Sequence, residues 1–116
     1  MTSETLLQLW KSYLDAYADI PDAERESLLR LSVADDIVFS NPAAQGHGCA
    51  DLVKHIVEFQ KQFPGAHFKS IKLLSHHSQL LSEVMLFNKD GSELGSARIF
   101  ARFNEQGRLT EVTGFF

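Results

Sequence analysis

Residues 34–42 read Ala-Asp-Asp-Ile-Val-Phe-Ser-Asn-Pro, a β-branched and aromatic run between two acids and a proline. Ile37, Val38 and Phe39 favour a short strand. Pro42 ends that strand, because proline has no N–H to donate to a neighbouring strand. The pattern before this strand is helical and the pattern in the second half of the chain is stranded. The sequence therefore predicts a helical first half followed by a sheet.

Three helices are predicted in this first half. The first has an apolar stripe at three- and four-residue steps, formed by Leu6, Leu7, Trp10, Tyr13, Leu14 and Tyr17. Thr2 or Ser3 is placed to cap its start. The second begins with Pro21 in its first turn and stops near Asp35-Asp36. A loop over 43–48 leads to the third, whose apolar side is Leu52, Val53, Ile56, Phe59 and Phe63, closed by Pro64-Gly65.

The second half predicts four strands, over residues 68–75, 80–88, 94–103 and 109–116. A short hairpin connection over 76–79 joins the first two. The turns over 88–92 and 104–108 both start with Asn and contain Gly in the fourth place, which is typical of a type I turn followed by a left-handed residue. Helices followed by hairpins indicate an α+β protein with a mostly antiparallel sheet.

The composition is that of one domain spanning residues 1–116. Apolar residues make up 44% and charged residues 22% of the chain, enough for one core. A net charge of -4 without a Lys/Arg cluster predicts no nucleic acid and no membrane surface as partner. No apolar run is long enough to span a bilayer, and the N-terminus does not read as a signal peptide. The single cysteine, Cys49, cannot form an internal disulfide, so we expect a cytoplasmic location.

These features resemble the cystatin-like α+β cone, the superfamily of nuclear transport factor 2, ketosteroid isomerase and SnoaL-like polyketide cyclases. The resemblance rests on the Leu-x-x-Leu-Trp-x-x-Tyr helix, residues 34–42, Gly48, Phe63-Pro64-Gly65, and Gly107-Arg108-Leu109 leading to Gly114-Phe115-Phe116. It implies three N-terminal helices packed on a strongly curved sheet, with an apolar internal pocket between them. Gly95, Gly107 and Gly114 suit such a sheet because glycine permits bulges and bends.

The resemblance to ketosteroid isomerase places three catalytic positions on this sequence. The general base of that family is an aspartate before the strand-ending proline, where this chain has Asn41, which cannot accept a proton near neutral pH. The family's oxyanion hole, a tyrosine and a protonated aspartate, falls on Trp10 and Ile99, with Tyr13 one helical turn away. Because all three groups are missing, that activity is not expected.

Glu83 is the first candidate to replace them. A three-residue loop within 88–92 pairs Glu83 with Ala97, which turns the carboxyl inward on the same face as Ile99. Burial there raises the pKa of a carboxyl and suits it to general acid or base chemistry. A register slip of one residue would leave Glu83 solvated instead.

Asn41 and His47 are the other catalytic candidates. Asn41 either donates a hydrogen bond to a substrate oxygen or shapes the turn before Pro42. His47 lies in the loop before the third helix, near the rim of the expected pocket, although loop histidines are usually just exposed. Cys49 precedes the same helix, whose positive end would lower the pKa of its thiol.

The residues expected to line the pocket are mostly aromatic or apolar. They are Trp10, Tyr13, Tyr17, Phe39, Asn41, Phe59, Phe63, Met85, Phe87 and Ile99. The two tyrosines either offer hydroxyls to the pocket or belong to the core. His55 and His67 are expected on the surface. His76 and His77 are expected to point to opposite faces, as neighbours on extended backbone do, and not to share a metal. No spacing matches a metal site, and we expect neither metal nor cofactor.

The leading hypothesis is a small-molecule-binding domain for an apolar ligand or substrate, with its exact activity unassigned. One alternative is a cofactor-free acid/base enzyme, such as an isomerase, dehydratase or polyketide cyclase. Another is a non-catalytic protein-interaction domain. Arg98, Phe100 and Arg102 face outward if Ile99 faces inward, which favours a homodimer through the outer sheet face. The sequence names neither the ligand nor which of Phe115 and Phe116 enters the pocket.

Overall fold

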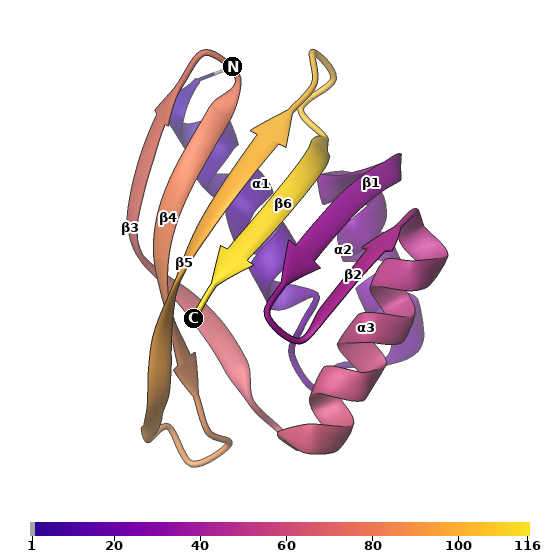
Figure 1. Cartoon of the computed structure of the whole chain (residues 1–116), viewed down its shortest axis with the longest axis vertical. Helices are drawn as coiled ribbons and strands as arrows, with labels where there is room; N and C mark the ends of the chain where they lie inside the picture. Colours follow the sequence, from indigo (N-terminus) through magenta and orange to yellow (C-terminus); the bar gives the residue numbers. More distant parts are fainter. Residues whose placement is uncertain (1) are drawn as a thin grey trace.

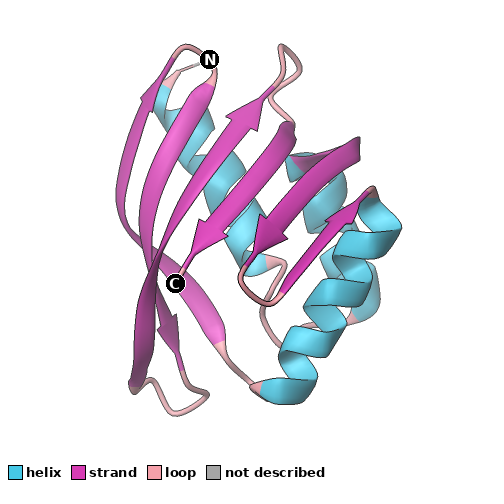
Figure 2. Cartoon of the chain, viewed as in Figure 1, coloured by secondary structure: helices cyan, strands magenta, loops and turns pink. Residues whose placement is uncertain are grey.

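The computed structural model describes residues 2–116, which form helices on one face of a single sheet (Figures 1 and 2). In chain order the elements are α1 (Ser3–Asp15), α2 (Asp22–Ser32), β1 (Val33–Asn41), β2 (Ala44–His47), α3 (Cys49–Gln62), β3 (His67–His76), β4 (Gln79–Phe87), β5 (Glu93–Phe103) and β6 (Leu109–Phe115). The α+β class is confirmed. The three helices do not all precede the sheet, because β1 and β2 lie between α2 and α3.

The start of α1 follows from its cap. The Thr2 hydroxyl accepts the backbone N–H of Thr5 at 3.1 Å and satisfies one of the free donors of the first turn. The buried stripe differs in one place from the prediction, since Leu9 is buried whereas Leu7 is 55% exposed. The helix therefore turns the face of Leu6, Leu9 and Tyr13 toward the sheet.

The first strand is longer than predicted. Helix α2 ends at Ser32, not near Asp35-Asp36, and β1 starts at once because Val33 and Ile37 are both buried against the core. Residues 44–47, predicted to lie in a loop, form the edge strand β2. The two strands meet in a tight turn in which the side-chain oxygen of Asn41 accepts the next two available backbone N–H groups.

The sheet has the order β2-β1-β6-β5-β4-β3 (Figure 1). The neighbouring strands β1 and β6 are parallel, and every other pair is antiparallel. One extra residue interrupts the register in three strands, at Ile71, Leu94 and Thr110. Such bulges bend a strand and increase its twist, which accounts for the curvature seen in Figure 1.

The core lies between the helices and the concave face of the sheet. Its largest completely buried apolar side chains are Trp10, Ile37, Leu52, Ile56, Leu80, Val84 and Leu109. Ala97, Ile99 and Ala101 of β5 face this core, as predicted, and Arg98 and Arg102 face the other side. Within residues 2–116, no helix has the length and apolar character to cross a membrane.

Candidate functional site

A group of aromatic and polar side chains lies between the helices and the sheet. We call it the interior cluster and define it as Tyr13, Tyr17, Phe39, Asn41 and His55. Tyr13 comes from α1, Tyr17 from the connection after it, Phe39 and Asn41 from β1, and His55 from α3. The fold thus brings together residues from two helices, a strand and a connection.

Asn41 and His55 form the polar centre of this cluster. The side-chain oxygen of Asn41 accepts the N–H groups of Ala43 and Ala44 at 2.9 and 3.0 Å, so the oxygen is fixed on the turn. Its amide nitrogen then points to Nε2 of His55 at 3.2 Å. Because an amide nitrogen only donates, Nε2 must be the acceptor, and the proton of the imidazole lies on Nδ1.

The surroundings of His55 favour this uncharged form. Its ring stacks on Phe39 with centroids 5.4 Å apart, and the ring of Tyr17 meets it edge-on at 6.1 Å. The side chain is only partly exposed, and desolvation lowers the pKa of His55 below its ordinary value. The candidate site therefore contains a neutral imidazole whose single lone pair is held by an amide.

The two tyrosines form a second polar pair. Their hydroxyl oxygens lie 3.0 Å apart and both side chains are buried. Burial raises the pKa of Tyr17 to about 12 and raises that of Tyr13 well above its usual range. At neutral pH both are hydrogen-bond donors or acceptors and neither is a base.

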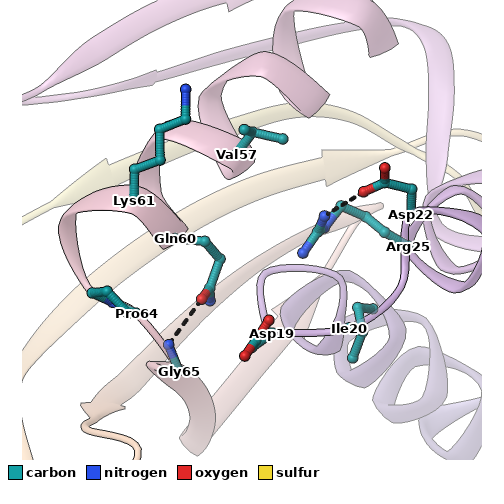
Figure 3. A pocket seen from close by; sticks show the side chains of 9 residues that line it. All are labelled: Asp19, Ile20, Asp22, Arg25, Val57, Gln60, Lys61, Pro64 and Gly65. Carbon is teal, nitrogen blue, oxygen red and sulfur yellow. Dashed lines mark hydrogen bonds and ion pairs between the residues drawn. The ribbon is translucent and has the colours of Figure 1, made fainter.

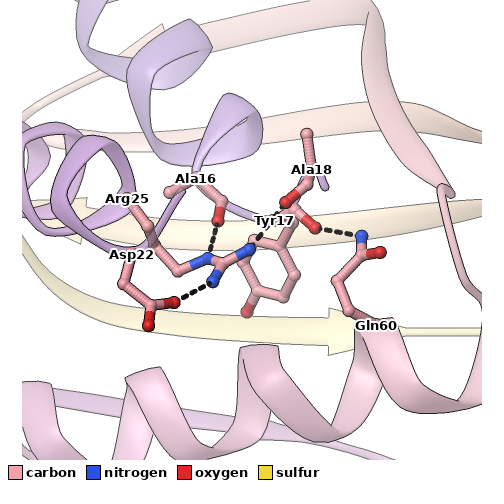
Figure 4. A network of polar contacts seen from close by, with 6 residues as sticks. All are labelled: Ala16, Tyr17, Ala18, Asp22, Arg25 and Gln60. Atoms are coloured by element: carbon pink, nitrogen blue, oxygen red, sulfur yellow. Dashed lines mark hydrogen bonds and ion pairs between the residues drawn. The ribbon is translucent and has the colours of Figure 1, made fainter. Parts of the chain in front are cut away.

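Two side chains, Arg25 and Gln60, hold the backbone around Tyr17 by hydrogen bonds to its carbonyl groups (Figure 4). Arg25, a buried residue of α2, donates from Nε to the carbonyl of Ala16 at 2.9 Å and from Nη2 to that of Ala18 at 2.7 Å. Gln60 of α3 donates to the carbonyl of Tyr17 at 2.7 Å. The position of the Tyr17 ring is therefore set by groups on two different helices.

Trp10 and Ile99, the positions aligned with the oxyanion hole of ketosteroid isomerase, both lie beside Ser82 in the packed interior. The indole N–H of Trp10 donates to the hydroxyl of Ser82 at 3.0 Å, and Ser82 lies beside Ser70 at 3.1 Å. Ser82 is also the register partner of Ile99. This part of the interior joins α1 to the sheet and has no free donor on Trp10.

Two surface depressions are the best formed in the part of the chain that the structure describes. One, of about 320 Å³, lies between the α1–α2 connection and the end of α3 and is lined by Arg25, Gln60 and Lys61 among others (Figure 3). The other, of about 310 Å³, lies between the start of α1 and the β3–β4 turn. Neither is lined by a residue of the interior cluster, whose own rings occupy the space expected to be a pocket. The internal pocket therefore stays a prediction.

The predicted inward position of Glu83 is wrong. The turn over 88–92 forms as expected, but Leu94 is an extra residue in β5 and shifts the register by one, so Glu83 pairs with Arg98 instead of Ala97. The carboxylate lies 3.7 Å from the Arg98 guanidinium. Leu80, Ser82 and Val84 face the core in its place. Glu83 therefore lies on the outer face of the sheet.

Met85 and Phe87 share that outer face with Glu83, because side chains alternate along a strand. Phe87 stacks on His67, with ring centroids 5.5 Å apart. These two residues were expected to line the pocket, and the same register shift removes them from it.

Other expected pocket residues lie at the margin of the interior. Phe59 packs against the core and stacks on Phe68, whereas Phe63 is 39% exposed and lies against Phe59, with ring centroids 5.7 Å apart. His47 is exposed at the end of β2. The pKa of the Cys49 thiol was expected to be lowered by the start of α3. Burial and the charge of Asp35 raise it instead.

His55 is the site residue that sequence analysis missed. Its spacing carries the signal, because it stands three residues after Leu52 and four before Phe59, on the apolar side of α3. A polar residue within an apolar helical face needs a partner when buried, and Asn41 is that partner. Among residues 2–116 no group of three or more His, Cys, Asp or Glu side chains is arranged to hold a metal ion.

No protein-family model and no curated protein matches this sequence. Solved structures do match. A candidate isomerase of the SnoaL-like family from Agrobacterium tumefaciens superposes with a TM-score of 0.88 at 23% identity, covering 97% of each chain. A candidate polyketide cyclase from Sinorhizobium meliloti gives 0.76 at 16% identity, covering 98% of this chain and 99% of the other. A protein of unknown function with a cystatin-like fold from Nostoc punctiforme gives 0.76 at 16%, covering 99% and 92%. The chain therefore has the cystatin-like fold of the SnoaL-like and nuclear-transport-factor-2-like proteins, as its sequence indicated.

Proposed function

We propose that this chain is a small-molecule-binding domain whose apolar ligand enters beside His55 and Asn41. The observation that carries the proposal is the contact of a neutral, partly buried imidazole with an amide at 3.2 Å, against the aromatic wall of Phe39. Binding pockets combine such walls with a few polar groups that orient the ligand. The ligand class that fits has an apolar body and one carbonyl or hydroxyl oxygen.

Entry of a ligand requires the interior cluster to rearrange. The rings of Tyr17, Phe59 and Phe68 lie 5.3 to 5.7 Å from one another and fill the space beside His55. Phe59 is only partly buried, so its rotation toward solvent is the least costly way to open this space. The bound form is then a minor conformation of the free protein that the ligand selects.

Thermal-shift screening against steroid, terpenoid, polyketide and fatty-acid sets tests this proposal. We expect one class to raise the melting temperature in a concentration-dependent manner. His55→Phe fills the binding position and should abolish the shift, whereas His47→Phe, at an exposed position, should retain it. An equal shift in both variants would place the ligand elsewhere, and no shift with any class would contradict ligand binding.

A cofactor-free acid/base enzyme is the second candidate function, and the interior cluster favours it specifically. If Asn41 releases Nε2, His55 can take a proton from a carbon next to a substrate carbonyl, while Asn41 or Tyr17 donates a hydrogen bond to that oxygen. The position of the isomerase aspartate is Asn41 here, and His55 contacts Asn41 at 3.2 Å, so His55 is the candidate base. The candidate isomerase with the same fold supports this reaction class.

Deuterium exchange separates binding from catalysis. A ligand that shifts the melting temperature is incubated in heavy water, and exchange at the carbon next to its carbonyl is followed by NMR. Catalysis predicts exchange that is lost in His55→Gln and kept in the control variant His67→Gln. Binding without exchange in the wild type would assign the chain to the non-catalytic class.

The outer face of the sheet supports a homodimer and is also the surface for the protein-interaction alternative. It exposes the apolar side chains Val38, Leu74, Leu81 and Phe115. The ion pairs Glu83–Arg98 and Arg102–Glu111 lie on the same face and provide polar contacts at its margin. We assign the chain to the cytoplasm, where the thiol of Cys49 stays reduced.

Light scattering after size-exclusion chromatography tests the dimer. The wild type should elute as a dimer and Leu81→Asp as a monomer. Leu31→Asp is the matched control, because Leu31 is 59% exposed on α2, away from the sheet. A monomeric wild type at high concentration would rule out the dimer.

A further inference from the structure

The turn between β3 and β4 brings two neighbouring histidines together. His77 and Ser78 occupy its two central positions with φ of 50° and 60°, and His76 pairs with Gln79 across it, as in a type I′ hairpin. On extended backbone His76 and His77 would point to opposite faces. The left-handed conformation of His77 instead directs its ring to that of His76, and their Nδ1 atoms lie 2.9 Å apart.

This separation fits two ligands of one metal ion. With metal–nitrogen bonds of about 2.0–2.1 Å, donor atoms 2.9 Å apart subtend about 90° at the metal. A tetrahedral angle would require about 3.4 Å at the same bond length. Adjacent positions at 90° belong to square-planar and octahedral geometry, which nitrogen ligands provide for Cu²⁺ and Ni²⁺.

The surroundings leave room for the remaining ligands. Both imidazoles are exposed and border the depression of about 310 Å³, whose other lining residues are Thr2, Ser3, Leu6, Ser75, Ser78 and Phe103. No lysine or arginine is among the residues lining this depression. Since the described residues form no group of three or more metal-ligating side chains, water completes the coordination.

We propose that His76 and His77 form a two-histidine site for a divalent transition-metal ion of tetragonal geometry, Cu²⁺ or Ni²⁺. Each ring binds through Nδ1 and carries its proton on Nε2. In the empty site one Nδ1 must hold a proton to contact the other, and on binding that proton moves through solvent to Nε2 of the same ring. The site shares no residue with the interior cluster and does not depend on the proposed function.

Titration of the full chain with Cu²⁺ tests the site, using isothermal calorimetry for affinity and electron paramagnetic resonance for the ligands. The variants are His76→Asn and His77→Asn, the latter chosen because asparagine tolerates the left-handed conformation and preserves the turn. His47→Asn removes another exposed histidine as a control. Ser78→Gly keeps both imidazoles and retains the turn. Circular dichroism and melting temperatures establish that each variant is folded.

We expect one Cu²⁺ per chain with two nitrogen ligands, and a loss of affinity of about tenfold or more in either His76→Asn or His77→Asn. His47→Asn and Ser78→Gly should bind as the wild type does. A loss of only about twofold in each single variant would mean two independent histidines and would overturn the proposal. So would unchanged affinity in the double variant, or tighter binding of Zn²⁺ in a tetrahedral geometry.

Discussion

The folded protein favours the uncharged form of His55, because burial lowers the pKa of its imidazole and one ring nitrogen accepts a hydrogen bond. Nε2 accepts from the amide of Asn41, and the aromatic rings of Phe39 and Tyr17 exclude water from much of the imidazole. A protonated Nε2 would meet the amide donor head-on, which adds to the cost of desolvating the charge. Burial therefore lowers the pKa of His55, and the contact with Asn41, 14 positions earlier in the chain, favours the same uncharged form.

Asn41→Asp should raise the pKa of His55, whereas the wild-type surroundings lower it. The carboxylate keeps an oxygen for the N–H groups of Ala43 and Ala44, and its second oxygen accepts from a protonated Nε2. We expect the pKa of His55 to move from below its ordinary value to above it, measured by NMR titration of the ring protons. The wild-type protein titrated under the same conditions serves as the control. A His55 pKa unchanged by the substitution would mean that the two side chains are not in contact.

The lowered pKa of His55 also predicts how stability depends on pH. The folded chain binds a proton at His55 less readily than the unfolded chain does, so the free energy of unfolding falls as the pH drops below about 6.5, the ordinary pKa of histidine. His55→Gln should remove this part of the dependence and His47→Gln should not. Urea unfolding of the three proteins between pH 7.5 and 5 measures the difference, and parallel curves for the wild type and His55→Gln would contradict it.

At the scale of single elements, the residue types in a turn determine its backbone conformation more directly than those in a strand do. Gly91 and Gly107 have φ of 88° and 72° and occupy the left-handed position that their turns require. In the β3–β4 turn the same kind of position is filled by His77 and Ser78, which lack the freedom of glycine. This hairpin therefore stores backbone strain that the other two avoid.

Substitutions at three positions should reveal this difference. Gly91→Ala should lower the free energy of unfolding by about 1–2 kcal/mol, entirely through its backbone, because nothing lies within 4 Å of the added carbon. Gly95→Ala is the matched control, with equal space and no positive φ, and should cost nothing. Ser78→Gly should gain roughly 0.5 kcal/mol by relieving strain. Chemical denaturation measures all three, and equal effects at Gly91 and Gly95 would contradict the backbone explanation.

At the scale of the whole molecule, α1 and the sheet are joined by a polar contact inside an apolar core. The indole of Trp10 and the hydroxyl of Ser82 are both completely or almost completely buried and lie 72 residues apart in sequence. An unpaired donor in such a place is costly, so this hydrogen bond fixes where α1 lies across β4.

Ser82→Ala should therefore destabilise the protein by about 1–3 kcal/mol, because it leaves the indole N–H buried without an acceptor. Ser70→Ala, at the exposed neighbour of Ser82, should change stability by less than about 0.5 kcal/mol. Urea unfolding gives both values. In a double-mutant cycle with Trp10→Phe, additive effects would show that the two side chains do not interact.

Local patterns were enough to predict most elements. A cap at Thr2 or Ser3, the end of α3 before Pro64-Gly65 and the two glycine turns were predicted because each depends on a few adjacent residues, and Thr2 is the cap that forms. Strand β2 was not predicted, since Ala44–His47 has no strand pattern and pairs only because β1 lies beside it. The inward face of Ile99 was predicted from the resemblance and is confirmed.

Some of the residues expected to line the pocket do lie together in the structure. Tyr13 and Tyr17 meet in the interior because their spacing places both on the apolar face of one helix, and Phe39 and Asn41 of β1 reach the same place through His55. That these residues bind a ligand stays a prediction. The inward position predicted for Glu83 was wrong because one extra residue in β5, Leu94, shifts the β4–β5 register by one. The shift places Glu83 on the outer face of the sheet. His55 was missed because its partner lies on another element.

The sequence by itself determined the helices, the turns, the class of fold and the apolar faces, since periodicity, caps and turn residues act over a few positions. Only the tertiary structure decided the β4–β5 register, the pairing of His55 with Asn41 and the meeting of His76 with His77. The physical reason is the distance along the chain over which each interaction acts. A bulge costs little locally yet exchanges the two faces of a strand, and a buried polar side chain takes whichever partner the packed elements bring to it.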